Sequence, residues 1–260
     1  MIQLSEGIWA VMWNVIGGAI VAGLTLAMQG ICKKVRRRSF RMIFGKDVEN
    51  DFYLVYPLFE PPSSEIVFKK PPSKVSRKTY SATNLSEVHS TAVTRAVNYL
   101  AYEIGSSSVT PPRIISDVDA DKSMDISFLA IGGRTNHKTV DIFDNEENKF
   151  LDFKDGSIVS KESEDPIINV ESEVDYAIIM KINPFAKSER TWLCCAGFGE
   201  WGTSGAAWWL SHNWKTIYKG AKNRPFACIT CTKVGSDDST KMLHLFLSSE
   251  DVQHATPKSK

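Results

Sequence analysis

The stretch with the most recognisable chemistry is a glycine-rich segment in the last third of the chain. Gly197, Gly199 and Gly202 satisfy the spacing G-x-G-x-x-G, and the hydroxyl residues Thr203 and Ser204 follow directly. In this pattern the first glycine permits a tight turn, and the second lets the backbone approach a phosphate closely. The start of a helix then supplies free N–H groups and the positive end of its dipole. The segment therefore predicts a phosphate-binding turn.

Three observations argue against a standard dinucleotide site in this segment. The pattern lies late in the chain, Glu200 stands where a pyrophosphate would approach, and no acidic residue ends a following strand at the expected spacing. Three interpretations stay open. The segment binds a phosphate or a nucleotide-like ligand, it is a purely structural corner, or it is a catalytic loop in which Glu200 serves a nucleotide or N-glycosidic hydrolase.

A second candidate site is the stretch AIGGRTNHKT. Gly132 and Gly133 would allow a close approach of the backbone, and Arg134 can hold a phosphate or a carboxylate with two parallel hydrogen bonds. Thr135 and Asn136 add polar groups on the same short loop. The alternative is an ordinary polar turn, because glycine pairs and asparagine are common turn residues.

Both glycine turns follow apolar runs that read as strands. The run at 190–196 precedes the first turn and a helical pattern starts at Thr203, while the run MDISFLAI precedes the second turn. In largely parallel sheets, ligands bind beyond the carboxyl ends of the strands. The sequence therefore predicts that the two turns pair to form one ligand site.

The remaining pattern supplies the elements that position this site. Apolar runs and a helical repeat of period four alternate over 51–250, and Asp155-Gly156 marks a hairpin turn. A further short strand is expected at 66–68, and 251–260 reads as a polar tail. The order predicts an α/β fold, a Rossmann-like three-layer sandwich with a mostly parallel sheet and a β-hairpin insertion.

An apolar segment at 8–28 carries no charged residue, and the basic run KKVRRR at 33–38 follows it within the segment 29–50. About 20 apolar residues suffice for a transmembrane helix, and positive charge stays on the cytoplasmic side. A signal peptide would carry its charges before the apolar run. We expect a single-pass protein of the cell inner membrane, with its N-terminus outside and its domain in the cytoplasm. Gly18 and Ala22, four residues apart, could support a homo-oligomer through this helix.

The two turns together, with GG-x-x-N at 132–136 and G-x-G-x-x-G-T-x-G-A-A at 197–207, carry a resemblance. They resemble uncharacterised bacterial membrane-anchored Rossmann-like proteins over roughly the last half of the chain. The resemblance implies that the two loops pair, and it implies no catalytic residue. By analogy with membrane-tethered nucleotide sensors, a role in bacterial antiviral defence follows as an expectation.

Other constellations do not add a cofactor or a metal. The near balance of 31 Lys+Arg against 30 Asp+Glu gives no field for nucleic acid, so no nucleic-acid partner is expected. Cys228 and Cys231 lie within one apolar run, which predicts core cysteines, and the five histidines have no metal-site spacing. The acidic run around Asp117 and Asp125 lacks the glycine of a calcium loop, so a solvated turn is expected.

Four tryptophans surround the glycine segment, and they could stack on a base or pack against the sheet; they are Trp201, Trp208, Trp209 and Trp214. The helical spacing of the apolar residues favours burial for at least two of them. The leading hypothesis is a membrane-anchored sensor or effector that binds a nucleotide or another phosphorylated small molecule. The alternatives are a membrane-anchored hydrolase that uses Glu200 and an assembly module without a ligand. The sequence names no cofactor.

Overall fold

The computed structural model describes residues 3–58, 85–108, 110–121, 125–169, 173–185 and 189–255, with side chains from residue 17 and, after the first gap, from residue 91. The chain divides into two units, Met1–Ser39 and Phe40–Lys260. The second unit contains the α/β domain and the candidate site.

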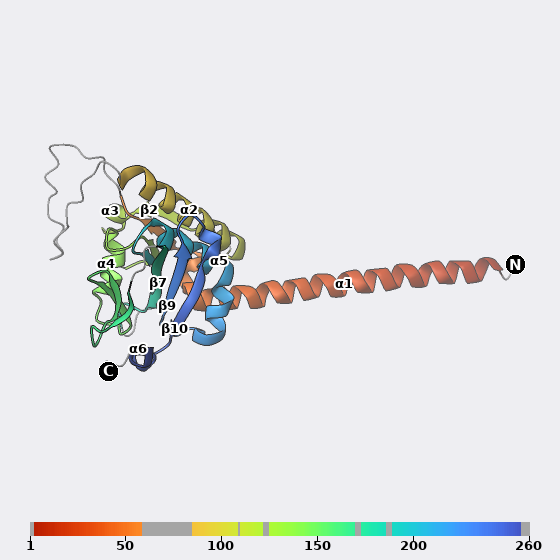
Figure 1. The fold of residues 1–260 in the computed structure, drawn as a ribbon. Helices are drawn as coiled ribbons and strands as arrows, with labels where there is room; N and C mark the ends of the chain where they lie inside the picture. Colours follow the sequence, from red (N-terminus) through yellow and green to blue (C-terminus); the bar gives the residue numbers. More distant parts are fainter. Residues whose placement is uncertain are drawn as a thin grey trace. The chain divides into compact units, whose positions relative to one another are not determined.

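The first unit is a single helix. Helix α1 (Gln3–Phe44) is unbroken, so it includes both the predicted apolar span and most of the basic segment after it (Figure 1). Its large apolar side chains from Ile20 to Ile31 are 57–68% exposed. By length and composition, Gly17–Phe44 is long and apolar enough to cross a membrane.

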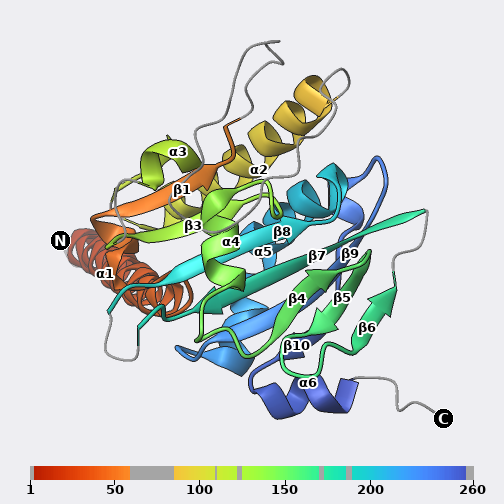
Figure 2. The ribbon, with the colours of Figure 1, turned by 90° about the vertical axis from the view of Figure 1, so that its left-hand side faces the viewer.

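The second unit is built on a seven-stranded sheet in the order β10-β9-β7-β8-β3-β1-β2 (Figure 2). Strands β2, β1, β3 and β8 are parallel neighbours, whereas β7 runs antiparallel to β8 and β9, and β10 antiparallel to β9. The predicted mostly parallel sheet is therefore confirmed. The strands are β1 (Phe52–Tyr56), β2 (Arg113–Ser116), β3 (Ser127–Ile131), β7 (Val174–Ile182), β8 (Trp192–Gly197), β9 (Phe226–Lys233) and β10 (Lys241–Phe246).

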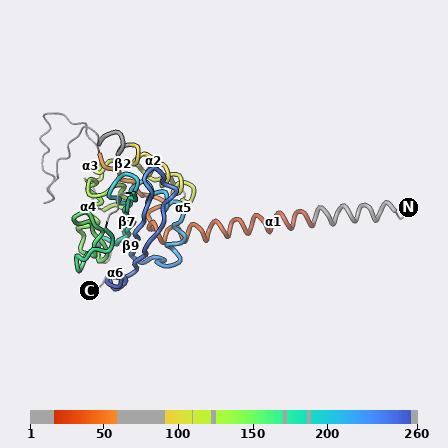
Figure 3. Tube along the Cα trace, viewed as in Figure 1, coloured from red at the N-terminus to blue at the C-terminus, as the bar shows by residue number. Residues whose placement is uncertain are grey.

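Helices cover both faces of this sheet. Successive side chains of its buried strands point alternately to the two faces, so there is a hydrophobic core on each side. In β3, Leu129 and Ile131 join the core under α2 and α5, while Phe128 and Ala130 join the core under α4. Figures 1 and 3 show α4 on one side of β7 and β9 and α5 on the other. The helices are α2 (Leu85–Ser107), α3 (Asp117–Ala120), α4 (His137–Phe143), α5 (Glu200–Ala221) and α6 (Ser249–Ala255), with 3-10 turns η1 (Lys46–Glu49) and η2 (Asp237–Ser239).

The insertion between α4 and β7 is a small antiparallel sheet of β4 (Leu151–Lys154), β5 (Ser157–Ser160) and β6 (Pro166–Asn169). Its first hairpin turns at Asp155 and Gly156, whose φ angles are 48° and 75°. Both central residues of a type I′ turn need positive φ, which is why Asp-Gly favours it. The predicted hairpin is confirmed, and β6 extends it to three strands.

The compact unit differs at its ends from the expected range 51–250. Phe40 and Phe44, from the segment expected to be juxtamembrane, stack at 4.3 Å between ring centroids, and Phe40 meets Trp214 edge-on at 5.1 Å. Val252 in α6 is buried, although the sequence placed it in a polar tail. The sequence did not predict these contacts, because the apolar side chains that make them are too few to show a helical or strand period. The strand expected at 66–68 lies outside the described residues.

A buried lysine holds the end of α1 within the second unit. The Lys181 ammonium, 1% exposed, donates a hydrogen bond of 2.6 Å to the carbonyl of Met42 in the last turn of α1. It also lies 3.4 Å from the side-chain oxygen of Asn223. Helix ends leave carbonyls without intrahelical partners, and a cation there is favourable. Burial nonetheless lowers the pKa of Lys181 to about 8.

This lysine should make the domain more stable as the pH rises above 8. Between its folded pKa of about 8 and the ordinary value of 10.5, the unfolded chain holds the proton and the folded chain does not. Unfolding then takes up a proton, so the free energy of unfolding should rise by up to roughly 3 kcal/mol across this window. Urea unfolding of the natural chain and of Lys181→Met at several pH values measures the effect. An equally steep rise in Lys181→Met would assign it to another group.

Candidate functional site

The two glycine turns lie side by side at one edge of the sheet. Strands β3 and β8 are parallel neighbours, and the amide of Gly132 donates to the carbonyl of Cys195 at 3.0 Å. A Cβ on Gly133 would lie 2.8 Å from the carbonyl oxygen of Gly197, so the close packing of the turns requires glycine at 133. The pairing of the turns expected from the sequence is therefore present.

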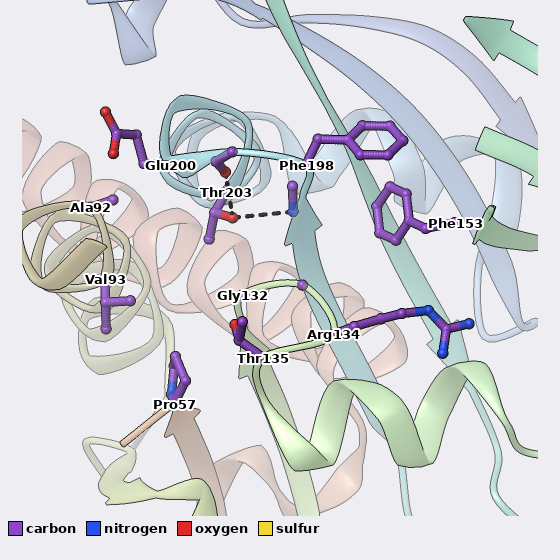
Figure 4. Close-up of a pocket in the computed structure, with 13 residues that line it drawn as sticks. Pro57, Ala92, Val93, Gly132, Arg134, Thr135, Phe153, Phe198, Glu200 and Thr203 are labelled. Carbon is purple, nitrogen blue, oxygen red and sulfur yellow. Dashed lines mark hydrogen bonds between the residues drawn. The ribbon is translucent and has the colours of Figure 1, made fainter. Parts of the chain in front are cut away.

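A cleft of about 210 Å³ lies where these turns meet (Figure 4). It opens beyond the carboxyl ends of β1, β3 and β8, and α2 forms one wall. From β1 the chain adds β2 on one side and β3 on the other, so the strand order reverses at the cleft. Its lining comprises Pro57, Ala92, Val93, Gly132, Gly133, Arg134, Thr135, Phe153, Gly197, Phe198, Gly199, Glu200 and Thr203.

The N-terminus of α5 already holds an anion from the protein itself. The carboxylate of Asp175, in β7, accepts hydrogen bonds from the amides of Gly199 at 3.1 Å and Gly202 at 2.7 Å. Burial raises the pKa of the Asp175 carboxyl, and these amide hydrogen bonds oppose the rise. A Cβ on either glycine would lie within 2.5–2.7 Å of this carboxylate. The G-x-G-x-x-G spacing here makes room for Asp175, in the position that a phosphate was expected to take.

The two hydroxyl residues after the glycines are used within the protein. The Thr203 hydroxyl donates to the carbonyl of Gly199 at 3.0 Å and accepts from the amide of Gly197 at 3.1 Å, which closes the turn (Figure 4). Ser204 is fully buried and donates to Asp237 at 2.5 Å. Arg95 in α2 donates to both Ser204 and Asp237, at 3.0 and 2.8 Å. Ser204 thus ties α5 to α2 and η2 and does not line the cleft.

Asn136 is a structural strut at the base of the second turn. Its side-chain amide is fully buried and donates to the carbonyls of Val55 and Ile131, each at 2.9 Å. Its side-chain oxygen accepts from the amide of Lys138 at 2.9 Å and so caps α4. These bonds join the ends of β1 and β3. Asn136 was expected to contact a ligand, but its hydrogen-bonding groups face the protein.

Two ionisable side chains line the cleft among the described residues, and they lie at opposite ends of it (Figure 4). Arg134 points toward the small sheet, where it pairs with Asp152 and lies 3.7 Å from Asp144. Glu200 lies on the α2 side. Hydrolysis by a pair of carboxylates needs a second acid across from the first, and the described lining holds Glu200 alone. The geometry gives no support to a catalytic carboxylate pair.

Sequence reasoning missed the apolar walls of the cleft. Val93 comes from α2, and Phe153 comes from the small sheet, where its ring meets Phe198 edge-on at 4.5 Å between centroids. A helical period or an alternating strand marks these residues as half-buried but does not say which cavity they border. The aromatic side chains near the candidate ligand are therefore phenylalanines.

The tryptophans expected near a base have other partners. Trp209 and Trp214 are 7% and 2% exposed, which confirms burial for two of the four. The indole N–H of Trp214 donates to Glu103 at 2.8 Å, and Trp201 lies under the guanidinium of Arg95 at 4.3 Å. These rings hold α2 against α5.

Three cysteines of the sheet are core residues, among them Cys228, whereas Cys231 is only partly buried. Cys194, Cys195 and Cys228 are fully buried, and burial raises the pKa of the Cys194 thiol to about 12. Cys228 and Cys231 face opposite cores of the sheet, so they cannot share a ligand.

The acidic run is partly buried instead of fully solvated. Asp117 is 1% exposed and accepts hydrogen bonds from the amides of Leu58 and His137, at 2.9 and 3.1 Å. In the described part of the chain, no group of three or more His, Cys, Asp or Glu side chains is placed to hold a metal ion. Asp117 thereby fixes the segment after β1 to the start of α4.

No family model, no curated protein and no solved structure matches this chain.

Proposed function

We propose that this protein is a membrane-anchored sensor or effector whose α/β domain binds a nucleotide or another phosphorylated small molecule in the cleft. The observation that carries the proposal is the position of the cleft. It lies beyond the carboxyl ends of β1, β3 and β8, where the strand order reverses. Open sheets with parallel strands bind their ligands at such points.

Unused hydrogen-bond donors border the cleft at the second turn. Within the described residues, the amides of Gly133, Arg134 and Thr135 donate no hydrogen bond. Gly132, with φ of 110°, places this turn in a conformation that favours glycine. Successive free amides of this kind suit an oxyanion. These amides, and not the start of α5, are the backbone donors open to a ligand oxygen in the cleft, because Asp175 occupies the start of α5.

The properties of α1 support the anchor. Between Ile20 and Ile31 its large apolar side chains are exposed, and Lys33, Lys34 and Arg38 follow as exposed cations. Exposed apolar side chains on a long helix suit a lipid environment, and the basic residues favour the cytoplasmic side. We propose a single-pass topology with the domain in the cytoplasm. By analogy with membrane-tethered nucleotide sensors, we also propose a role in bacterial antiviral defence.

Filling the cleft should abolish ligand binding. Val93→Trp would place an indole in a space of about 210 Å³, so the affinity for a bound nucleotide should fall at least about tenfold. Asn98→Trp, on the exposed side of α2, is the matched control and should bind normally. Native mass spectrometry of the full chain in detergent, with a panel of nucleotides, measures the binding. Equal binding by both variants would place the ligand elsewhere.

The same experiment separates the other two hypotheses. Release of a chemically altered nucleotide that stops in Glu200→Gln would favour a hydrolase. If no nucleotide in the panel binds the natural chain, the ligand-binding proposal is wrong. The small residues of α1 would then point to an assembly role, because a Cβ added at Gly17, Gly18 or Gly23 would meet no atom outside the helix backbone within 4 Å, which leaves room for a second helix.

A further inference from the structure

A second hollow of about 210 Å³ adjoins the cleft. Arg134 and Phe153 line both spaces. The rest of the second hollow comes from the small sheet and the turn after β5; it comprises Asp152, Lys154, Val159, Ser160, Lys161 and Glu164. The insertion therefore extends the space available to a ligand beyond the sheet edge.

Three cations and two carboxylates line this hollow. Arg134, Lys154 and Lys161 converge on it from three segments, against the carboxylates of Asp152 and Glu164. Asp152 serves two of these cations: it pairs with Arg134, and the Lys161 ammonium lies 2.9 Å from its second oxygen. Glu164 pairs with Lys154. Asp152 is therefore shared between two cations, while Arg134 also lies 3.7 Å from Asp144 outside the lining of the hollow. A phosphate that takes the place of Asp152 can contact Arg134 and Lys161 at once.

The cations are also accessible to a ligand. The side chains of Lys161, Arg134 and Lys154 are 29%, 41% and 48% exposed. The guanidinium of Arg134 presents a planar set of donors that matches two phosphate oxygens at once. Its backbone amide belongs to the turn with free N–H groups. Arg134 thus joins the donors of the cleft to the cations of the hollow.

Phe153 lines both spaces and has an aromatic environment. Its ring meets Phe198 at 4.5 Å and Phe143 at 5.3 Å between centroids, both edge-on. On the cleft side, Pro57, Val93 and Phe198 offer a weakly polar surface. Flat, weakly polar groups bind well between such side chains. The cleft suits the body of a ligand and the hollow suits its charge.

We propose that the ligand is a phosphomonoester with a flat, weakly polar body, such as a nucleoside monophosphate. The body binds in the cleft against Phe198, and the phosphate binds in the hollow among Arg134, Lys154 and Lys161, where it displaces Asp152 from Arg134. This inference rests on the proposed function and specifies the charge and the shape of its ligand. It also gives the insertion a role in binding.

Isothermal titration calorimetry on the full chain in detergent tests this assignment, with four common nucleosides and their 5′-monophosphates as probes. The monophosphate should bind at least about tenfold more tightly than its nucleoside. Lys154→Met with Lys161→Met should remove most of this advantage and leave the nucleoside affinity unchanged. Lys215→Met with Lys219→Met, two exposed lysines on α5, is the charge-matched control and should change neither affinity.

Asp152→Asn gives a change in the opposite direction. It keeps the side-chain oxygen that accepts from the amide of Phe153 at 2.7 Å, while it frees Arg134 and Lys161 from a carboxylate. The monophosphate affinity should rise several-fold, which a loss of folding cannot mimic. If monophosphates bind no tighter than nucleosides, or if Asp152→Asn does not strengthen them, the hollow is not the phosphate site, although the cleft still binds nucleosides. If no nucleoside or monophosphate binds, both this inference and the proposed function fail.

Discussion

Gly199→Ala should destabilise the domain in the natural chain and have almost no effect in a chain that carries Asp175→Ala. A Cβ at 199 would lie 2.5 Å from a carboxylate oxygen of Asp175, and the three nearest atoms to it all belong to this carboxylate. The backbone at Gly199, with φ of −116°, is open to alanine. The cost therefore comes from Asp175 alone, and we expect roughly 2 kcal/mol.

Asp175→Ala by itself should lower the free energy of unfolding by about 4 kcal/mol, because it leaves the amides of Gly199 and Gly202 without their acceptor at the start of α5. A double-mutant cycle measured by urea unfolding gives the coupling between the two sites. Additive costs for Gly199→Ala and Asp175→Ala would show that the glycine serves something other than the carboxylate. Gly156→Ala, at a positive-φ turn with open space around it, is the control and should show no coupling to Asp175.

Asn136→Ala should have the second large effect and lower the free energy of unfolding by about 3–5 kcal/mol. The side chain is fully buried, and its removal leaves the carbonyls of Val55 and Ile131 and the amide of Lys138 without their partner. Each such group costs about 1–3 kcal/mol when it is buried and unpaired. Because the lost bonds join β1 to β3, the cleft should lose its shape together with the stability.

Asn136→Asp distinguishes this role from a role in ligand binding. The carboxylate is isosteric but would point an acceptor at two carbonyl oxygens, so the variant should be destabilised at neutral pH and regain stability as acid protonates it. Asn213→Ala, which removes one helical side-chain bond of 3.1 Å, is the control and should lose under about 1 kcal/mol. Thermal unfolding across a range of pH measures the stability of both variants. A stable Asn136→Asp at neutral pH would contradict the strut and return Asn136 to the candidate ligand contacts.

The internal carboxylate changes what the glycine pattern means for function. The spacing of Gly197, Gly199 and Gly202 matches a phosphate-binding turn, and the strand and the helix lie where that turn needs them. The helix start binds an anion, as the physics of its free amides requires. That anion is Asp175, so a phosphate must find its donors elsewhere, and we propose for it the cations Arg134, Lys154 and Lys161 of the second hollow.

The sequence by itself determined most of the elements and the edge of the sheet at which they meet. Apolar runs such as the one in β3, the four-residue period in α2 and the Asp155-Gly156 turn are local signals, since each reports on neighbours within a few residues. Because each of the two glycine turns follows a predicted strand of a largely parallel sheet, the sequence also predicted that the turns lie together. The apolar segment in α1 was equally visible, because a long stretch without charge needs no tertiary information.

Only the tertiary structure decided which donors remain for a ligand. Asp175 lies 24 residues before Gly199 in the sequence, and Asn136 reaches Val55 across 81 residues. No periodicity encodes such pairs, because they depend on the register between strands and on which way each side chain points. The same holds for Phe153 and Arg134, which meet at the cleft from separate segments. A local pattern fixes where a turn forms, whereas the long-range packing fixes what fills it.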